Sequence, residues 1–271
     1  MATETHGWCL FCGAEKSVTV SAWPDWATQL VADASAVRYS PEMIDKVTKQ
    51  IITAAPQGYL REDFIATRKL RVACKRCHKG WMSRIDAKAR SVLLPLIRGD
   101  GVVLLPAVQE ALAAWIAKTI MITEFASTDR VVTPEAERAQ LRQTTQAPRS
   151  WNIWIAYNNA RNWEARYVRH AANLCGAISR ISSDKRPVND THSVSLGMGK
   201  VLVHIMASTV SGMKFQLPNG RGEAFHTLWP VRDAISWPPR ISLNKRQVES
   251  FSTTFNRDFG LPEVGLIGAV A

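Results

Sequence analysis

Between residues 73 and 82 the chain reads Ala73-Cys74-Lys75-Arg76-Cys77-His78-Lys79-Gly80-Trp81-Met82, which contains one Cys-x-x-Cys pair. A second pair lies near the start, in Trp8-Cys9-Leu10-Phe11-Cys12-Gly13. A tight Cys-x-x-Cys turn offers two sulfurs to one ion, and structural zinc takes four thiolates at about 2.3 Å in a tetrahedron. We therefore expect one structural Zn²⁺ on Cys9, Cys12, Cys74 and Cys77. A redox-active pair is the alternative, and spacing alone does not separate zinc from iron.

The composition is that of a globular chain with a polyanionic partner. Of its 271 residues, 46% are hydrophobic and 21% are charged. The net charge is +11 and the pI is near 9.7. These proportions exclude a disordered chain, and the excess of cations favours nucleic acid over a membrane surface or an acidic protein.

No membrane segment or secretion signal is expected. The polar start of the chain lacks the basic head and apolar core of a signal peptide. The most apolar region, residues 102–125, is interrupted by Pro106, Glu110 and Lys118 and is typical of a buried helix. Because four of the five cysteines suit a metal, a reducing, cytoplasmic location is predicted.

Periodicity and capping signals predict an α+β fold in three parts. These are a metal-binding domain over 1–100, a helical connector over 101–147 and a β-rich α+β domain over 148–271. Within them, alternation predicts strands and a period near 3.6 predicts helices. The expected strands are 17–22, 69–73, 151–157, 163–170, 177–181 and 193–207, the last with a bulge near Gly197 and Gly199. The expected helices are 40–55, 79–92, 106–126, 133–144 and 244–257.

Basic residues are concentrated around the second Cys-x-x-Cys pair. Between residues 68 and 90 there are nine of them against one acid, Asp86. A strand, a turn and a helix that all carry positive charge form a plausible surface for phosphate groups, although charged faces also serve solubility alone. The predicted nucleic-acid contacts are Arg68, Lys69, Arg71, Lys75, Arg76, Lys79, Arg84 and Lys88.

Several sequence words resemble one protein family. They are Cys-x-x-Cys-Gly at 9–13, Ala22-Trp23-Pro24-Asp25-Trp26 after a strand, and Val-x-Cys-x-x-Cys-His-x-Gly-Trp-Met-Ser at 72–83. Weaker words follow at 112–119, 229–230 and 236–239. Together they are similar to a zinc-stapled HNH nuclease family of actinobacteria and their phages. The resemblance implies a treble-clef or ββα-like zinc domain, into which the helix expected over 40–55 is inserted.

The resemblance also implies a cutting site with one important change. HNH enzymes hold a second divalent metal, such as Mg²⁺ or Mn²⁺, and use a histidine as general base on water. Where relatives are expected to have Glu-His, this chain has Val20 and Ser21. His78 and Asp86 stand at two further family positions and are the candidate catalytic or metal-binding residues. Asp86 is equally suited to an ion pair with Arg90, four residues on. The alternative for His78 is a structural residue at a helix N-terminus beside the zinc site.

The sequence therefore predicts a zinc protein derived from an HNH nuclease that binds nucleic acid, with DNA expected, and has lost its general base. A working metal-dependent endonuclease that recruits His78, Asp86 or His6 is one alternative. A phage or mobile-element protein that grips a host protein through its aromatic, β-rich second half is another. Lys118, alone in an apolar helix, is expected to be a surface lysine that reaches water along its stem, and contact with a phosphate is the alternative.

Overall fold

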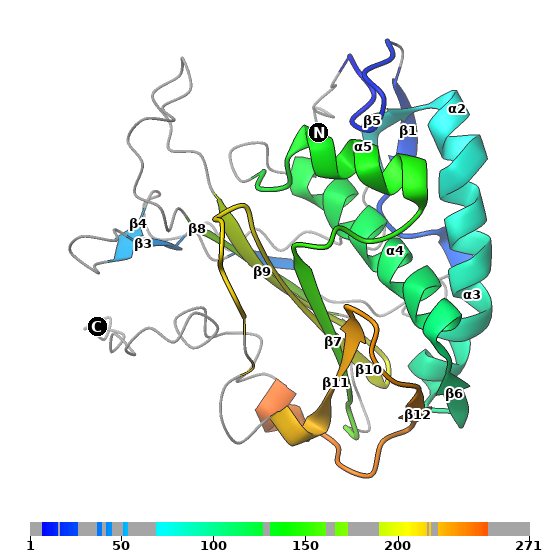
Figure 1. Ribbon diagram of the computed structural model, residues 1–271, viewed down its shortest axis with the longest axis vertical. Coiled ribbons are helices and arrows are strands. Elements are labelled where there is room, and N and C mark those ends of the chain that lie inside the picture. Colours follow the sequence, from blue (N-terminus) through cyan, green and yellow to red (C-terminus); the bar gives the residue numbers. More distant parts are fainter. Residues whose placement is uncertain are drawn as a thin grey trace, which may run out of the picture.

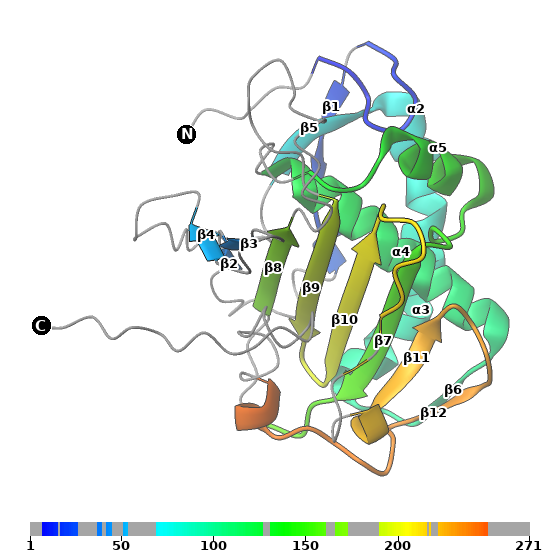
Figure 2. The same ribbon diagram turned by 60° about the vertical axis from the view of Figure 1, so that its left-hand side comes forward.

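A six-stranded sheet forms the centre of the computed structural model (Figures 1 and 2). Five of the strands are antiparallel to their neighbours, and the edge strand β2 runs parallel to β8. In spatial order the strands are β11 (Phe225–Trp229), β7 (Trp151–Tyr157), β10 (Val201–Ser208), β9 (Thr191–Met198), β8 (Arg166–Ala172) and β2 (Val37–Tyr39). The structure describes residues 7–15, 17–26, 37–39, 42–44, 51–53, 69–126, 131–160, 166–172, 190–215, 217 and 222–248.

The two central strands β9 and β10 are buried along their whole length, and they form a hairpin. Gly199 lies in its turn with φ +53°, and a Cβ at this position would lie 2.5 Å from the carbonyl oxygen of Ile97. Only glycine fits such a left-handed, crowded position. The predicted bulge near Gly197 is wrong, because the β9–β10 register is unbroken.

The helices lie in layers against this sheet (Figures 1 and 2). The long helix α4 (Pro106–Thr123) crosses one face of the sheet, and α3 (Ser83–Arg98) packs on the side of α4 away from the sheet. Helix α5 (Glu135–Thr144) also packs on α4. Helix α4 is apolar around most of its circumference, as expected for a helix buried between two layers.

A smaller unit of two strands and a helix joins these layers near the start of the chain. Strand β1 (Ser17–Ser21) pairs antiparallel with β5 (Lys69–Cys74), with a bulge between Val18 and Thr19. β5 runs directly into α2 (Lys75–Cys77), the π-helical turn η1 (His78–Met82) and then α3. A second small pair, β6 (Val102–Leu104) with β12 (Ile235–Trp237), lies at the far end of α3.

The predicted α+β class is confirmed, and so are most of the described elements. The inserted helix over 40–55 is wrong: β3 (Glu42–Ile44) and β4 (Ile51–Thr53) pair antiparallel instead. The apolar residues of this region fit two short strands as well as one helical face, and a run such as Ile-Ile-Thr favours a strand. The predicted strand 177–181, Arg68, His6 and the helix beyond residue 248 lie outside the described residues.

Candidate metal centre and adjoining pocket

The four cysteines of the two Cys-x-x-Cys pairs meet at one point. Their sulfur atoms all lie within 4.8 Å of one another, and none of the four forms a disulfide. Four sulfurs at about 2.3 Å from one tetrahedral ion lie about 3.8 Å apart. The Sγ atoms of Cys12 and Cys74 are 3.7 Å apart, so the cluster has the size of a metal site. It could hold a metal such as zinc, as the sequence predicts.

Local backbone geometry brings each pair of sulfurs together. In the first pair, the N–H of Gly13 donates to the carbonyl of Cys9 at 2.9 Å, and Gly13 has φ +67°. In the second, Cys74 caps α2, and its sulfur accepts a hydrogen bond from the N–H of Cys77. A hydrogen bond from Leu10 N to Val72 O, at 2.9 Å, fixes the first turn against β5.

The thiols of the cluster differ in acidity. Burial raises the pKa of Cys9 and of Cys77. Burial also acts on Cys74, but hydrogen bonds from the Cys77 backbone and from neighbouring thiols outweigh it and lower the pKa of Cys74 to about 7. Metal ligation requires thiolates, so binding of an ion here releases protons and is weaker at low pH.

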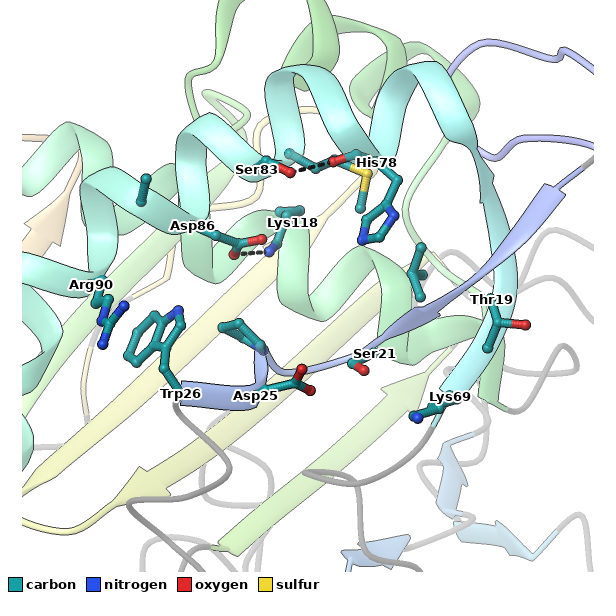
Figure 3. Close-up of a pocket in the computed structure, with 14 residues that line it drawn as sticks. Thr19, Ser21, Asp25, Trp26, Lys69, His78, Ser83, Asp86, Arg90 and Lys118 are labelled. Atoms are coloured by element: carbon teal, nitrogen blue, oxygen red, sulfur yellow. Dashed lines mark hydrogen bonds and ion pairs between the residues drawn. The ribbon is translucent and has the colours of Figure 1, made fainter.

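A cavity of about 810 Å³ opens beside the β1–β5 pair (Figure 3). Its walls come from β1, the Pro24–Trp26 segment, the start of β5, η1, α3 and α4. Ser21, His78 and Asp86 all line it, together with Asp25, Arg90 and Lys118. Residues that the sequence marked separately therefore lie around one cavity. This placement does not by itself test the catalytic roles predicted for His78 and Asp86.

The carboxylate of Asp86 is held by the ammonium group of Lys118 (Figure 3). The Lys118 side chain is 3% exposed and the Asp86 side chain 24% exposed. Burial lowers the pKa of Lys118, and the charge of Asp86 opposes that shift. The expectation of a surface lysine is wrong: Lys118 is buried between α4 and α3, and Asp86 of α3 is its counterion. The Asp86–Arg90 ion pair is not found either: Arg90 lies over the ring of Trp26, 5.9 Å from its centroid.

His78 and Ser21 complete the lining. The His78 ring points from η1 into the cavity, while its backbone carbonyl accepts a hydrogen bond from Ser83 Oγ at 2.7 Å (Figure 3). Ser21 ends β1, and the preceding Val20 is buried at 2% exposure. Among the described residues, the four cysteines are the only group of three or more Cys, His, Asp or Glu side chains whose ligand atoms come this close together.

Seven of the eight predicted nucleic-acid contacts are described, and all seven are exposed. They lie on β5 (Lys69, Arg71), α2 (Lys75, Arg76), η1 (Lys79) and α3 (Arg84, Lys88). We call them the basic segment. None of them makes an ion pair in the part of the chain that the structure describes. Their charges are therefore available to solvent or to a partner.

A buried charged cluster escaped the sequence analysis. Glu124 follows α4 in the short helix η2 (Glu124–Ala126) and is fully buried. Its Oε1 lies 2.9 Å from Arg169 Nη2 and 3.0 Å from His192 Nδ1. Backbone N–H groups of Val132 and Thr133 also donate to the carboxylate. An acid at the end of an apolar helix was a visible signal, but nothing in the sequence identified its partners.

No protein-family model, curated protein or solved structure matches this chain. The described helices include none with the length and apolar character needed to span a membrane.

Proposed function

We propose that this protein binds nucleic acid through the basic segment, which a zinc ion on the four cysteines holds in place. The observation that carries the proposal is the set of seven exposed, unpaired cations on consecutive elements β5, α2, η1 and α3. Phosphate contacts of this kind supply most non-specific affinity for nucleic acid. DNA is the expected partner.

The unit that carries these cations supports descent from an HNH nuclease. A cysteine turn, an antiparallel β1–β5 pair and a helix that starts at the second cysteine pair follow one another around the sulfur cluster. That order is the one expected of a treble-clef or ββα-like zinc domain. The resemblance in the sequence words and this arrangement of elements favour the same origin.

Three features argue for binding without metal-dependent cleavage. Val20 and Ser21 stand where a glutamate and the general-base histidine are expected, and neither can accept a proton near neutral pH. Loss of a general base lowers a rate by about 10² to 10⁴. Asp86 is already bound by Lys118. Finally, His78 and the nearby carboxylates do not converge as a ligand set among the described residues.

Fluorescence anisotropy with labelled duplex DNA and duplex RNA tests the binding function. Affinity should fall steeply between about 50 and 200 mM salt, with a slope of about −0.9 per neutralised phosphate on a log–log plot for DNA. Arg84→Glu combined with Lys88→Glu should weaken binding strongly. The matched control is Arg232→Glu with Arg240→Glu, two exposed arginines that flank β12. Absence of binding at low salt, or equal losses in both variants, would contradict the proposal.

A plasmid-nicking assay distinguishes a protein that only binds DNA from an active endonuclease. We expect no nicking when the purified protein is incubated with supercoiled plasmid and Mg²⁺ or Mn²⁺. Metal-dependent nicking that His78→Ala abolishes would instead establish an active endonuclease with His78 in its site.

A further inference from the structure

The cavity beside β1 contains a buried cation with unused hydrogen-bonding capacity. A lysine ammonium has three donors, and Asp86 accepts from Lys118. In the described part of the chain no other acceptor is bonded to the Lys118 ammonium. A buried donor without a partner is costly, so the remaining N–H groups call for an acceptor from water or from a ligand.

The charges around the cavity favour an anion over a metal ion. Three cationic side chains, Lys69, Arg90 and Lys118, line it together with two carboxylates, Asp25 and Asp86. Of these two carboxylates, Asp86 already contacts the ammonium (Figure 3). A divalent cation placed at Asp86 would meet the like charge of Lys118 at close range. The volume of about 810 Å³ lies within the range of about 300–1,000 Å³ that is usual for ligand pockets.

We infer that this cavity binds a phosphate group of the nucleic acid directly, with the Lys118 ammonium as its cation and without a divalent metal. The inference rests on the proposed function and adds a specific subsite to it. His78, whose ring points into the cavity, supplies a second polar contact, and Asp86 positions the ammonium. The phosphate is either an internal diester or a monoester at a strand end.

Isothermal titration of the zinc-loaded, full-length protein tests this assignment. The probes are a short oligothymidylate with a 5′-phosphate and the same strand without it, each with and without added MgCl₂. We expect binding that does not depend on Mg²⁺. Preference for the phosphorylated strand identifies a terminal monoester, and equal binding identifies an internal diester.

Two variants distinguish a phosphate site from a site for a divalent metal. Lys118→Met keeps the length of the side chain and should weaken binding by at least about tenfold, because one charge-assisted contact is lost. Asp86→Asn removes the negative charge beside the ammonium but keeps a side-chain oxygen that can accept from it, so phosphate binding should persist. In a metal site, Asp86→Asn would instead remove a ligand and weaken binding. If Lys118→Met proves unfolded by circular dichroism, Asp86→Asn still decides.

The double variant of Arg232 and Arg240, which lie outside the basic segment, is the control. Both residues are exposed and neither lines the cavity, so oligothymidylate binding near 150 mM salt should change little. Oligothymidylate binding that requires Mg²⁺, or that survives Lys118→Met unchanged, overturns the subsite. If the subsite is overturned but the protein still binds duplex in a salt-dependent way, the proposed function stands. If the protein binds neither oligothymidylate nor duplex, the subsite and the proposed function are both overturned.

Discussion

Two buried charges lie along the central helical layer, Lys118 in α4 and Glu124 just after it. Each is neutralised by a residue of another element: Lys118 by Asp86 of α3, and Glu124 by Arg169 of β8, while His192 of β9 also contacts Glu124. The Glu124 cluster is the more deeply buried of the two, because Glu124, Arg169 and His192 are each at most 2% exposed. Removing one member of such a cluster leaves the others charged and unpaired.

Glu124→Gln should therefore destabilise the protein by about 3–5 kcal/mol, the usual cost of breaking a buried ion pair from one side. Urea denaturation followed by circular dichroism measures the free energy of unfolding. Glu110→Gln in the preceding helix α4 is the control, since Glu110 is only half-buried and makes no ion pair among the described residues. A change below about 1 kcal/mol in Glu124→Gln would contradict a stabilising role for the cluster.

The same carboxylate makes stability depend on pH. Burial alone would raise the pKa of Glu124, but the charge of Arg169 and the contact with His192 outweigh it and lower the pKa from 4.5 to about 2. A lowered folded-state pKa means that the contribution is complete above about pH 4.5 and is lost as the pH falls toward 2. The loss should approach roughly 3 kcal/mol. Urea titrations across this range should show a steeper acid decline for the wild type than for Glu124→Gln; equal slopes would contradict the assignment.

At the scale of elements, the sulfur cluster holds the β1–β5 pair to the start of the α2–η1–α3 run. Its four cysteines come from a turn before β1 and from the junction of β5 with α2. The first turn contributes only a few backbone bonds of its own, such as Leu10 N to Val72 O. A bound metal is therefore expected to be the main restraint on this corner of the fold.

Cys12→Ser should lower the metal content from one ion per chain and reduce the melting temperature by roughly 10 °C, since each kcal/mol corresponds to about 2–4 °C for a chain of this size. Mass spectrometry of the metal and a thermal melt provide the two measurements. Cys175→Ser is the matched control, because the fifth cysteine belongs to neither Cys-x-x-Cys pair. Equal metal content in wild type and Cys12→Ser would refute the metal centre.

Elements with strong local signals could be predicted, and contacts between elements could not. The apolar circumference of α4 and the alternation of β7 identified both correctly. Residues 42–44 and 51–53 were misassigned to a helix because short apolar runs fit either period. The cysteine spacing predicted that the four cysteines come together. The Asp86–Lys118 and Glu124–Arg169 pairs join residues 32 and 45 positions apart, and such pairs leave no pattern in the sequence.

At the scale of the whole molecule, one hydrophobic core runs from the cysteine cluster to the sheet. It includes Phe11 beside the cluster, Trp115 in α4 and Ile205 in β10. The rings of Trp26 and Trp115 lie 6.4 Å apart and connect the β1 region with the helical layer. The three-part division expected from the sequence has boundaries inside this continuous core, so the parts should not unfold independently.

Trp115→Ala tests that coupling. Trp115 is fully buried, and its truncation should cost about 3–5 kcal/mol because a large cavity remains. In a cooperative molecule, metal release and loss of sheet signal should occur at the same temperature in the wild type, and both should fall together by roughly 10 °C in the variant. Trp8→Ala, at a side chain that is 59% exposed, should change the free energy of unfolding by no more than about 0.5 kcal/mol. Both temperatures should then stay close to those of the wild type. If metal is released well before the sheet melts, the metal-binding unit is an independent domain and the boundary near residue 100 is real.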